Sequence, residues 1–118
     1  MATGIPLILD VDTGVDDALA LGLAHVRPDI NLVAVTTLAG NIDVINVTEN
    51  TRRVLAFIGA GAVPIHQGAS RPLARAHRDA AHYHGLNGLG NAQFPETDTQ
   101  LGADRGPAAI IRLARQYP

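Results

Sequence analysis

The apolar positions of the chain fall into two kinds of pattern, continuous runs and helical stripes. Residues 5–11 form a nearly continuous apolar run, which is typical of a strand buried on both faces of a sheet. A second run, rich in β-branched residues, covers residues 30–38, and a shorter one covers residues 63–67. Between these runs, apolar residues recur at helical spacing over residues 16–25 and 47–58. The pattern therefore predicts the order strand, helix, strand, helix, strand.

This β-α-β-α-β order has a consequence for the sheet. Buried strands that are joined by helices pair in parallel, with right-handed crossover connections. We therefore expect an α/β fold with a parallel, Rossmann-like sheet. The length of 118 residues fits a single domain over residues 1–118.

The first predicted helix follows the first strand after one tight turn. Gly14 interrupts the apolar run, and Asp16 or Asp17 is expected to cap the helix. A carboxylate suits this position because the helix dipole is positive at its N-terminus. The apolar stripe of this helix consists of Leu19, Leu23 and Val26.

The segment from residue 68 to residue 106 differs from the rest of the chain. It is rich in glycine, proline and histidine and has no convincing period, which predicts a long lid-like loop. Pro107 then suits the first turn of a final helix. The apolar stripe of that helix is expected to contain Ile110, Leu113, Ala114 and Tyr117.

Composition and charge exclude several classes of function. The net charge is −2, without a basic excess, so we expect no nucleic-acid partner. The chain has no cysteine, which excludes disulfides, thiol catalysis and thiolate metal sites. No apolar run reaches the length of a membrane span and no leader pattern is present, so we expect a cytoplasmic protein without a membrane partner.

Four aspartates gather within eight residues at the end of the first predicted strand, at positions Asp10, Asp12, Asp16 and Asp17. Asp10 and Asp12 share one side of the strand near its carboxyl end, the edge where open parallel sheets bind ligands. Two carboxylates about 4 Å apart repel by about 4 kcal/mol at an effective dielectric of 20. A bound cation offsets that repulsion, and all-oxygen ligands favour a hard ion, Ca²⁺ or Mg²⁺.

The aspartates, the histidines and the glycines also admit simpler interpretations. One or two of the aspartates could simply cap the helix or end the strand in solvent. Four of the five histidines lie within residues 66–84, but their spacing matches no zinc pattern, which favours a solvated loop. The glycines of "GLNGLG" follow no clear strand, so they indicate lid flexibility rather than a dinucleotide fingerprint.

The segment "DVDT" also resembles the motif of the haloacid-dehalogenase phosphatases, in which the first aspartate is a nucleophile. In this chain the glycine and threonine that follow Asp12 stand in the opposite order. That family also offers no role for Asp16 and Asp17, so it is the weaker resemblance.

A second resemblance covers nearly the whole chain. "DVDTGVDDALAL" is similar to the N-terminal signature of the inosine/uridine-preferring nucleoside hydrolases. "TTLAGN" at residues 36–41, "NVTENTRRVL", "GASRPL" at residues 68–73 and "HGLNGLG" at residues 84–90 resemble later motifs of that family, in the same order. The resemblance implies that residues 1–118 are the N-terminal part of a longer hydrolase domain.

The resemblance also implies an activity and a set of site residues. Members of the family cleave the N-glycosidic bond of ribonucleosides with a calcium-bound water, releasing ribose and a purine or pyrimidine base. By the motif, Asp12 would be the general base and a calcium ligand, and Asp17 would bind the ion with both oxygens. Asp10 would support the cluster, either as a further ligand or as a neighbour of the ligands. Asp16, Asn41 and His84 would contact the substrate. The family also implies a homo-oligomer, either a dimer or a tetramer.

Further calcium ligands and the acid for the leaving base are expected in segments that this chain does not contain. Two alternatives to a hydrolase therefore remain. One is an inert fragment or a non-catalytic ion- or ribose-binding domain, and the other is the phosphatase.

Overall fold

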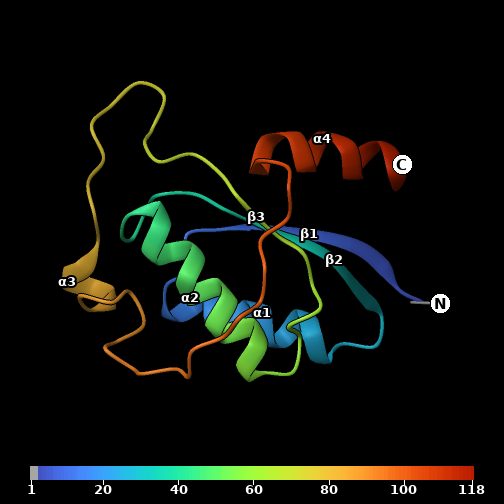
Figure 1. Ribbon diagram of the computed structural model, residues 1–118, viewed down its shortest axis with the longest axis horizontal. Helices are drawn as coiled ribbons and strands as arrows, with labels where there is room; N and C mark the ends of the chain where they lie inside the picture. The colour runs from blue at the N-terminus through green and yellow to red at the C-terminus, as the bar shows by residue number, and fades with distance from the viewer. Residues whose placement is uncertain (1–2) are drawn as a thin grey trace.

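The computed structural model describes residues 3–118 and contains a three-stranded parallel sheet between two layers of helices (Figure 1). The sheet order is β1-β2-β3, and both strand pairs are parallel. The elements are β1 (Ile5–Val11), α1 (Val15–Val26), β2 (Ile30–Thr37), α2 (Val44–Phe57), β3 (Ile65–Gln67), α3 (Ala81–His84) and α4 (Gly106–Gln116). The α/β fold and its β-α-β-α-β start, both predicted from the sequence, are confirmed.

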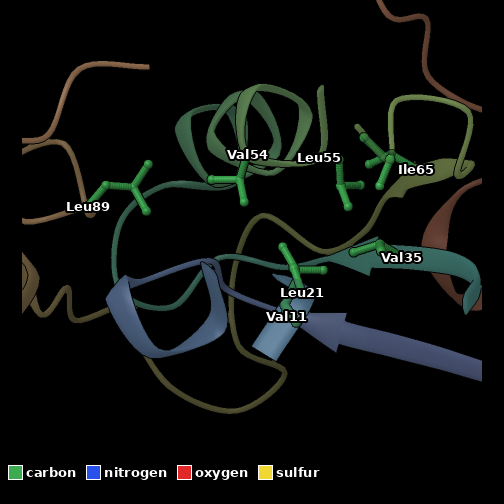
Figure 2. Packing of buried hydrophobic residues seen from close by; sticks show 8 residues of the cluster. Val11, Leu21, Val35, Val54, Leu55, Ile65 and Leu89 are labelled. Carbon is green, nitrogen blue, oxygen red and sulfur yellow. The ribbon is translucent and has the colours of Figure 1, made fainter. Parts of the chain in front are cut away.

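The hydrophobic core lies between the sheet and the pair of helices α1 and α2, whereas α4 covers the opposite face (Figure 1). Side chains from the sheet and from both helices converge in this core (Figure 2). The buried members of the cluster are Val11, Leu21, Val35, Val54, Leu55, Ala60, Ile65 and Leu89. Leu89 belongs to the loop after α3, so part of the predicted lid is anchored in the core.

Strand β1 is less buried than its apolar run predicted. It pairs only with β2 among the described residues, so it forms an edge of the sheet, and Ile5 at its start is 70% exposed. Residues 7–9 are half-buried and Asp10 is exposed, whereas Val11 at the end of the strand is only 5% exposed. The carboxyl end of β1 is therefore the part that the fold holds in place.

The predicted apolar stripe of α1 faces solvent. Leu19, Leu23 and Val26 are 73%, 61% and 71% exposed, while Leu21 and Ala24 are buried. The helix is apolar on almost every side, so periodicity alone could not select the face that packs. Contact with the sheet and α2 selects the face that carries Leu21.

The last helix lies where the sequence predicted it, but its predicted apolar stripe was largely wrong. Leu113 is buried and Ile110 is half-buried, whereas Ala114 and Tyr117 are exposed, and Tyr117 lies just beyond the helix. Helix α4 begins one residue before Pro107 and buries Ala109 and Leu113. The segment between β3 and α4 contains one short helix, α3, within an otherwise irregular path. No helix in residues 3–118 is long and apolar enough to cross a membrane.

Candidate functional site

Asp12 and Asn41 join the carboxyl ends of the two longer strands. Asp12 directly follows β1, and Asn41 lies in the turn between β2 and α2. The backbone N–H of Asn41 donates to Asp12 Oδ2 at 3.0 Å, and Asn41 Nδ2 donates to the Asp12 carbonyl oxygen, also at 3.0 Å. The backbone of Asn41 therefore orients the Asp12 carboxylate, while its side-chain amide, which was predicted to contact substrate, donates to the Asp12 backbone.

The side chain of Asp17 lies against that of Asp12. Asp17 occupies the first turn of α1, which enters the site from the turn after β1. Burial raises the pKa of the Asp17 carboxyl to about 6, helped by its hydrogen bond with Asp12 and by repulsion from Asp12 and Asp16. The backbone of Gly14 acts in the opposite direction. Asp12 and Asp17, two of the four aspartates expected to converge, thus form a close carboxyl pair, with the exposed Asp16 beside them.

Asp10 lies apart from that pair. Its Oδ1 accepts a hydrogen bond from Thr36 Oγ1 at 2.6 Å, and the two residues are direct partners in the β1–β2 register. The next residue, Val11, points into the core between the sheet and helices α1 and α2. Since successive side chains of a strand alternate, Asp10 belongs to the face covered by α4. The predicted convergence of all four aspartates is therefore not found.

The absence of a larger cluster is consistent with this placement. Within residues 3–118, no three histidine, aspartate or glutamate side chains come together in a group that could hold a metal ion. The carboxyl groups that do meet, those of Asp12 and Asp17, form an all-oxygen pair at the end of the sheet.

Two glycines allow this close packing. A Cβ atom on Gly14 would lie 2.5 Å from Asn41 Nδ2 and 2.6 Å from His84 Nδ1. A Cβ atom on Gly40 would overlap the carboxylate of Asp12. The pattern of neighbouring residues in the sequence did not predict that Gly14 and Gly40 would form part of the site.

His84 closes the site from the side of the lid. Its Nδ1 accepts a hydrogen bond from the Val15 backbone N–H at 3.3 Å, across 69 residues of sequence. Because Val15 is the first residue of α1, the histidine satisfies one of the free N–H groups at the start of that helix. The N-cap residue is Gly14, without a side-chain cap, so the prediction that Asp16 or Asp17 caps the helix was wrong.

The loop after His84 is tightly hydrogen-bonded, although its glycines had indicated flexibility. Asn87 Oδ1 accepts from the backbone N–H groups of Leu89 and Asn91, each at 2.9 Å. Asn50 on α2, which is 9% exposed, donates through Nδ2 to the Asn87 carbonyl oxygen at 2.7 Å. The sequence analysis did not predict that Asn50 anchors this loop. The only available signal was that Asn50 lies inside the family-like segment "NVTENTRRVL".

Comparison with known proteins places this geometry in a family. The sequence profile described as "Inosine-uridine preferring nucleoside hydrolase" matches residues 7–118, nearly the whole chain. The chain belongs to this family. The phosphatase alternative is thereby set aside, and the resemblance found from the motifs is confirmed.

Individual family members show how much of the family this chain represents. An inosine-uridine preferring nucleoside hydrolase of Leishmania major is 44% identical over 112 residues, covering 94% of this chain and 36% of that protein. A non-specific ribonucleoside hydrolase, RihC, of Escherichia coli is 43% identical, covering 81% of this chain and 31% of its own length. This member of the family thus spans about a third of the length of those relatives.

Solved structures give the same result for the fold. A plant nucleoside hydrolase, PpNRh1, superposes with a TM-score of 0.89 at 30% identity, covering 97% of this chain and 36% of that enzyme. A purine-preferring ribonucleoside hydrolase from Gardnerella vaginalis has the same TM-score at 28% identity, covering 95% of this chain and 37% of its own. The parallel sheet and its helices are therefore arranged as in the corresponding third of those enzymes.

Proposed function

We propose that the protein acts as a ribonucleoside hydrolase, which cleaves the N-glycosidic bond of purine or pyrimidine nucleosides to ribose and free base. The observation that carries this proposal is the Asp12–Asp17 pair at the end of β1, held by Asn41 and bordered by His84. The family supports the same chemistry, because its members in Leishmania major and Escherichia coli are named as nucleoside hydrolases. Since the chain spans about a third of those proteins, the activity is proposed for it rather than inherited from them.

The donor set of the pair fits calcium. The side chains of Asp12 and Asp17 are in contact, and each offers only oxygen atoms to a ligand. Such a pair suits a hard cation, which prefers oxygen to nitrogen or sulfur. Asp12 and Asp17 would hold the ion, whereas Asp10, which lies apart from the pair, would support the end of β1 through its hydrogen bond from Thr36. A bound calcium ion supplies positive charge that lowers the pKa of a nearby water.

Individual side chains of the chain would carry out the other steps of the reaction. Asp12, whose carboxylate is oriented by the backbone N–H of Asn41, accepts the proton of the attacking water. The exposed carboxylate of Asp16 accepts a hydrogen bond from a ribose hydroxyl. As the base departs, the sugar gains oxocarbenium character, and the nearby carboxylates stabilise its developing positive charge. Asn41 Oδ1 offers a polar contact to the water or the sugar, and the His84 ring, from the lid, offers one to the nucleobase.

The test is ribose release from inosine and uridine by the wild type and by Asp12→Asn. Loss of a general base typically lowers turnover by about 100-fold or more, and the asparagine keeps the size of the side chain. Asp98→Asn, which changes an exposed aspartate in the segment before α4, is the matched control and should retain full turnover. Equal ribose release by Asp12→Asn and Asp98→Asn would contradict the proposal.

A second function, as a non-catalytic ion- or ribose-binding domain, is favoured by one specific observation. Only two of the four aspartates meet within the described residues, which is a small ligand set for a catalytic ion. This alternative predicts saturable calcium or ribose binding, sensitive to Asp12→Asn, with no base release.

We also propose that the protein forms a homo-oligomer, since Leu19, Leu23 and Val26 expose an apolar face of α1.

A further inference from the structure

The nine arginines of the chain fall into two groups. Four form ion pairs with aspartate or glutamate, for example Arg52 and Arg53 with Glu49. Among residues 3–118 the other five form no ion pair, and three of these lie within residues 71–78 of the segment between β3 and α3. A chain with net charge −2 thus concentrates unpaired positive charge in one short segment.

Four of these five arginines line two cavities that share Pro72. One cavity, of about 690 Å³, is lined by Arg75, Arg78 and Gly40. The other, of about 450 Å³, lies at the start of α4 and is lined by Arg71 and Arg105. Both volumes fall within the range of roughly 300–1,000 Å³ that is usual for small-ligand sites.

The cavity that contains Arg75 and Arg78 borders the candidate site. Its wall includes Gly40, whose other side packs directly against the Asp12 carboxylate. His77 holds this wall in place, because its Nε2 lies 2.8 Å from the Gly40 carbonyl oxygen. The segment that carries the arginines projects on the side of the sheet where α4 lies (Figure 1). The positive cavity and the aspartate pair are thus separated by a single turn of backbone.

Unpaired guanidinium groups that line a cavity favour one chemical class of ligand. The planar N–H fork of arginine matches the oxygens of a phosphate, and such charge-assisted hydrogen bonds are about twice as strong as neutral ones. The neighbouring carboxylate of Asp79 accepts from the Ala81 backbone N–H and forms no ion pair with these arginines, so their guanidinium groups stay available to an anion.

We propose that the cavity lined by Arg75 and Arg78 binds a phosphate group, either as the free ion or as an ester of ribose. Arg71 and Arg105, across Pro72, strengthen the positive field around it. The sugar part of this inference rests on the proposed function, since a ribose at the aspartate pair would bring an attached phosphate toward Gly40.

Equilibrium binding of inorganic phosphate and of ribose 5-phosphate tests the proposal. We expect Arg75→Gln/Arg78→Gln to weaken binding of the preferred probe by about tenfold or more, because two charge-assisted contacts are lost. Arg71→Gln/Arg105→Gln should weaken it less, and that difference should shrink at high salt. Arg115→Gln removes another exposed, unpaired arginine, which lines neither cavity, and should leave binding unchanged.

The two probes separate the two sources of phosphate. Tighter binding of ribose 5-phosphate assigns the cavity to a phosphorylated sugar, whereas equal binding assigns it to the free ion. No binding of either probe would overturn the proposal, as would equal binding by Arg75→Gln/Arg78→Gln and Arg115→Gln, with circular dichroism confirming that each variant is folded. Inosine turnover measured on the same samples keeps this result distinct from a failure of the proposed function.

Discussion

At the level of single residues, the glycines beside the aspartate pair restrict the site as strongly as the aspartates do. Gly14 and Gly40 occupy places where a side chain would collide with Asn41, His84 or Asp12. These contacts join residues that lie far apart in the sequence. The geometry of the site therefore depends on how three separate turns pack together.

Gly40→Ala should displace the Asp12 carboxylate, because the new methyl group would occupy the same space. We expect the free energy of unfolding to fall by about 1–3 kcal/mol, as for other overpacked sites, and ribose release to fall with it. Chemical denaturation and the turnover assay measure the two effects.

Gly22→Ala is the matched control for that substitution, since nothing lies within 4 Å of a Cβ atom there and Gly22 is inside α1. It should stabilise the protein by about 0.5–1 kcal/mol. If Gly40→Ala behaved in the same way, the close contact between Gly40 and Asp12 would not constrain the site.

At the level of elements, the sequence predicted which strands and helices exist, and in what order, better than it predicted which face of a helix is buried. Strand β1 coincides with its prediction, and β3 starts two residues late, at Ile65, just after Pro64, which has no backbone N–H to donate to a sheet. The buried face of α1 was not predictable, because that helix is apolar on nearly all sides.

Leu21→Ala and Leu19→Ala make the same change on the two faces of α1. Leu21 is fully buried and Leu19 is 73% exposed. We expect Leu21→Ala to lower the free energy of unfolding by about 2–5 kcal/mol, the usual cost of a core cavity. Leu19→Ala should change it little in the monomer. Denaturant titration measures both, and equal effects would show that the stripe facing solvent is in fact packed.

The start of α2 should make stability depend on acid pH. Asp43 caps this helix, since its Oδ1 accepts from the Asn46 backbone N–H at 3.0 Å, and hydrogen bonds from Asn46 lower the pKa of Asp43. A lowered pKa in the folded state means that this stabilisation is present at neutral pH. It is lost as the pH falls below the ordinary aspartate value of about 3.9.

Asp43→Ala should therefore cost about 0.5–2 kcal/mol at neutral pH and less at pH 3. Asp43→Asn keeps an acceptor oxygen without the charge, so it should lose less stability at neutral pH and show a weaker dependence on pH. Urea denaturation at both pH values provides the comparison. A cost of Asp43→Ala that stayed the same at pH 3 would contradict the role of the carboxylate.

At the scale of the whole molecule, the parallel sheet brings together side chains that the sequence keeps far apart. The sequence predicted that aspartates gather at the carboxyl end of β1, and the structure pairs Asp12 with Asp17 there. It could not predict that Asp10 would turn to Thr36, because that contact depends on the register between β1 and β2. The lid likewise approaches α1 only because His84 reaches Val15 across the completed fold.

The most direct test of the account is ribose release from inosine with calcium present and after its removal by a chelator. The wild type should release ribose only with calcium, and Asp17→Asn should need more calcium and turn over at least about 100-fold more slowly. The same samples of Asp98→Asn should match the wild type. Ribose release that survives both chelation and Asp17→Asn would show that the Asp12–Asp17 pair is not the catalytic centre.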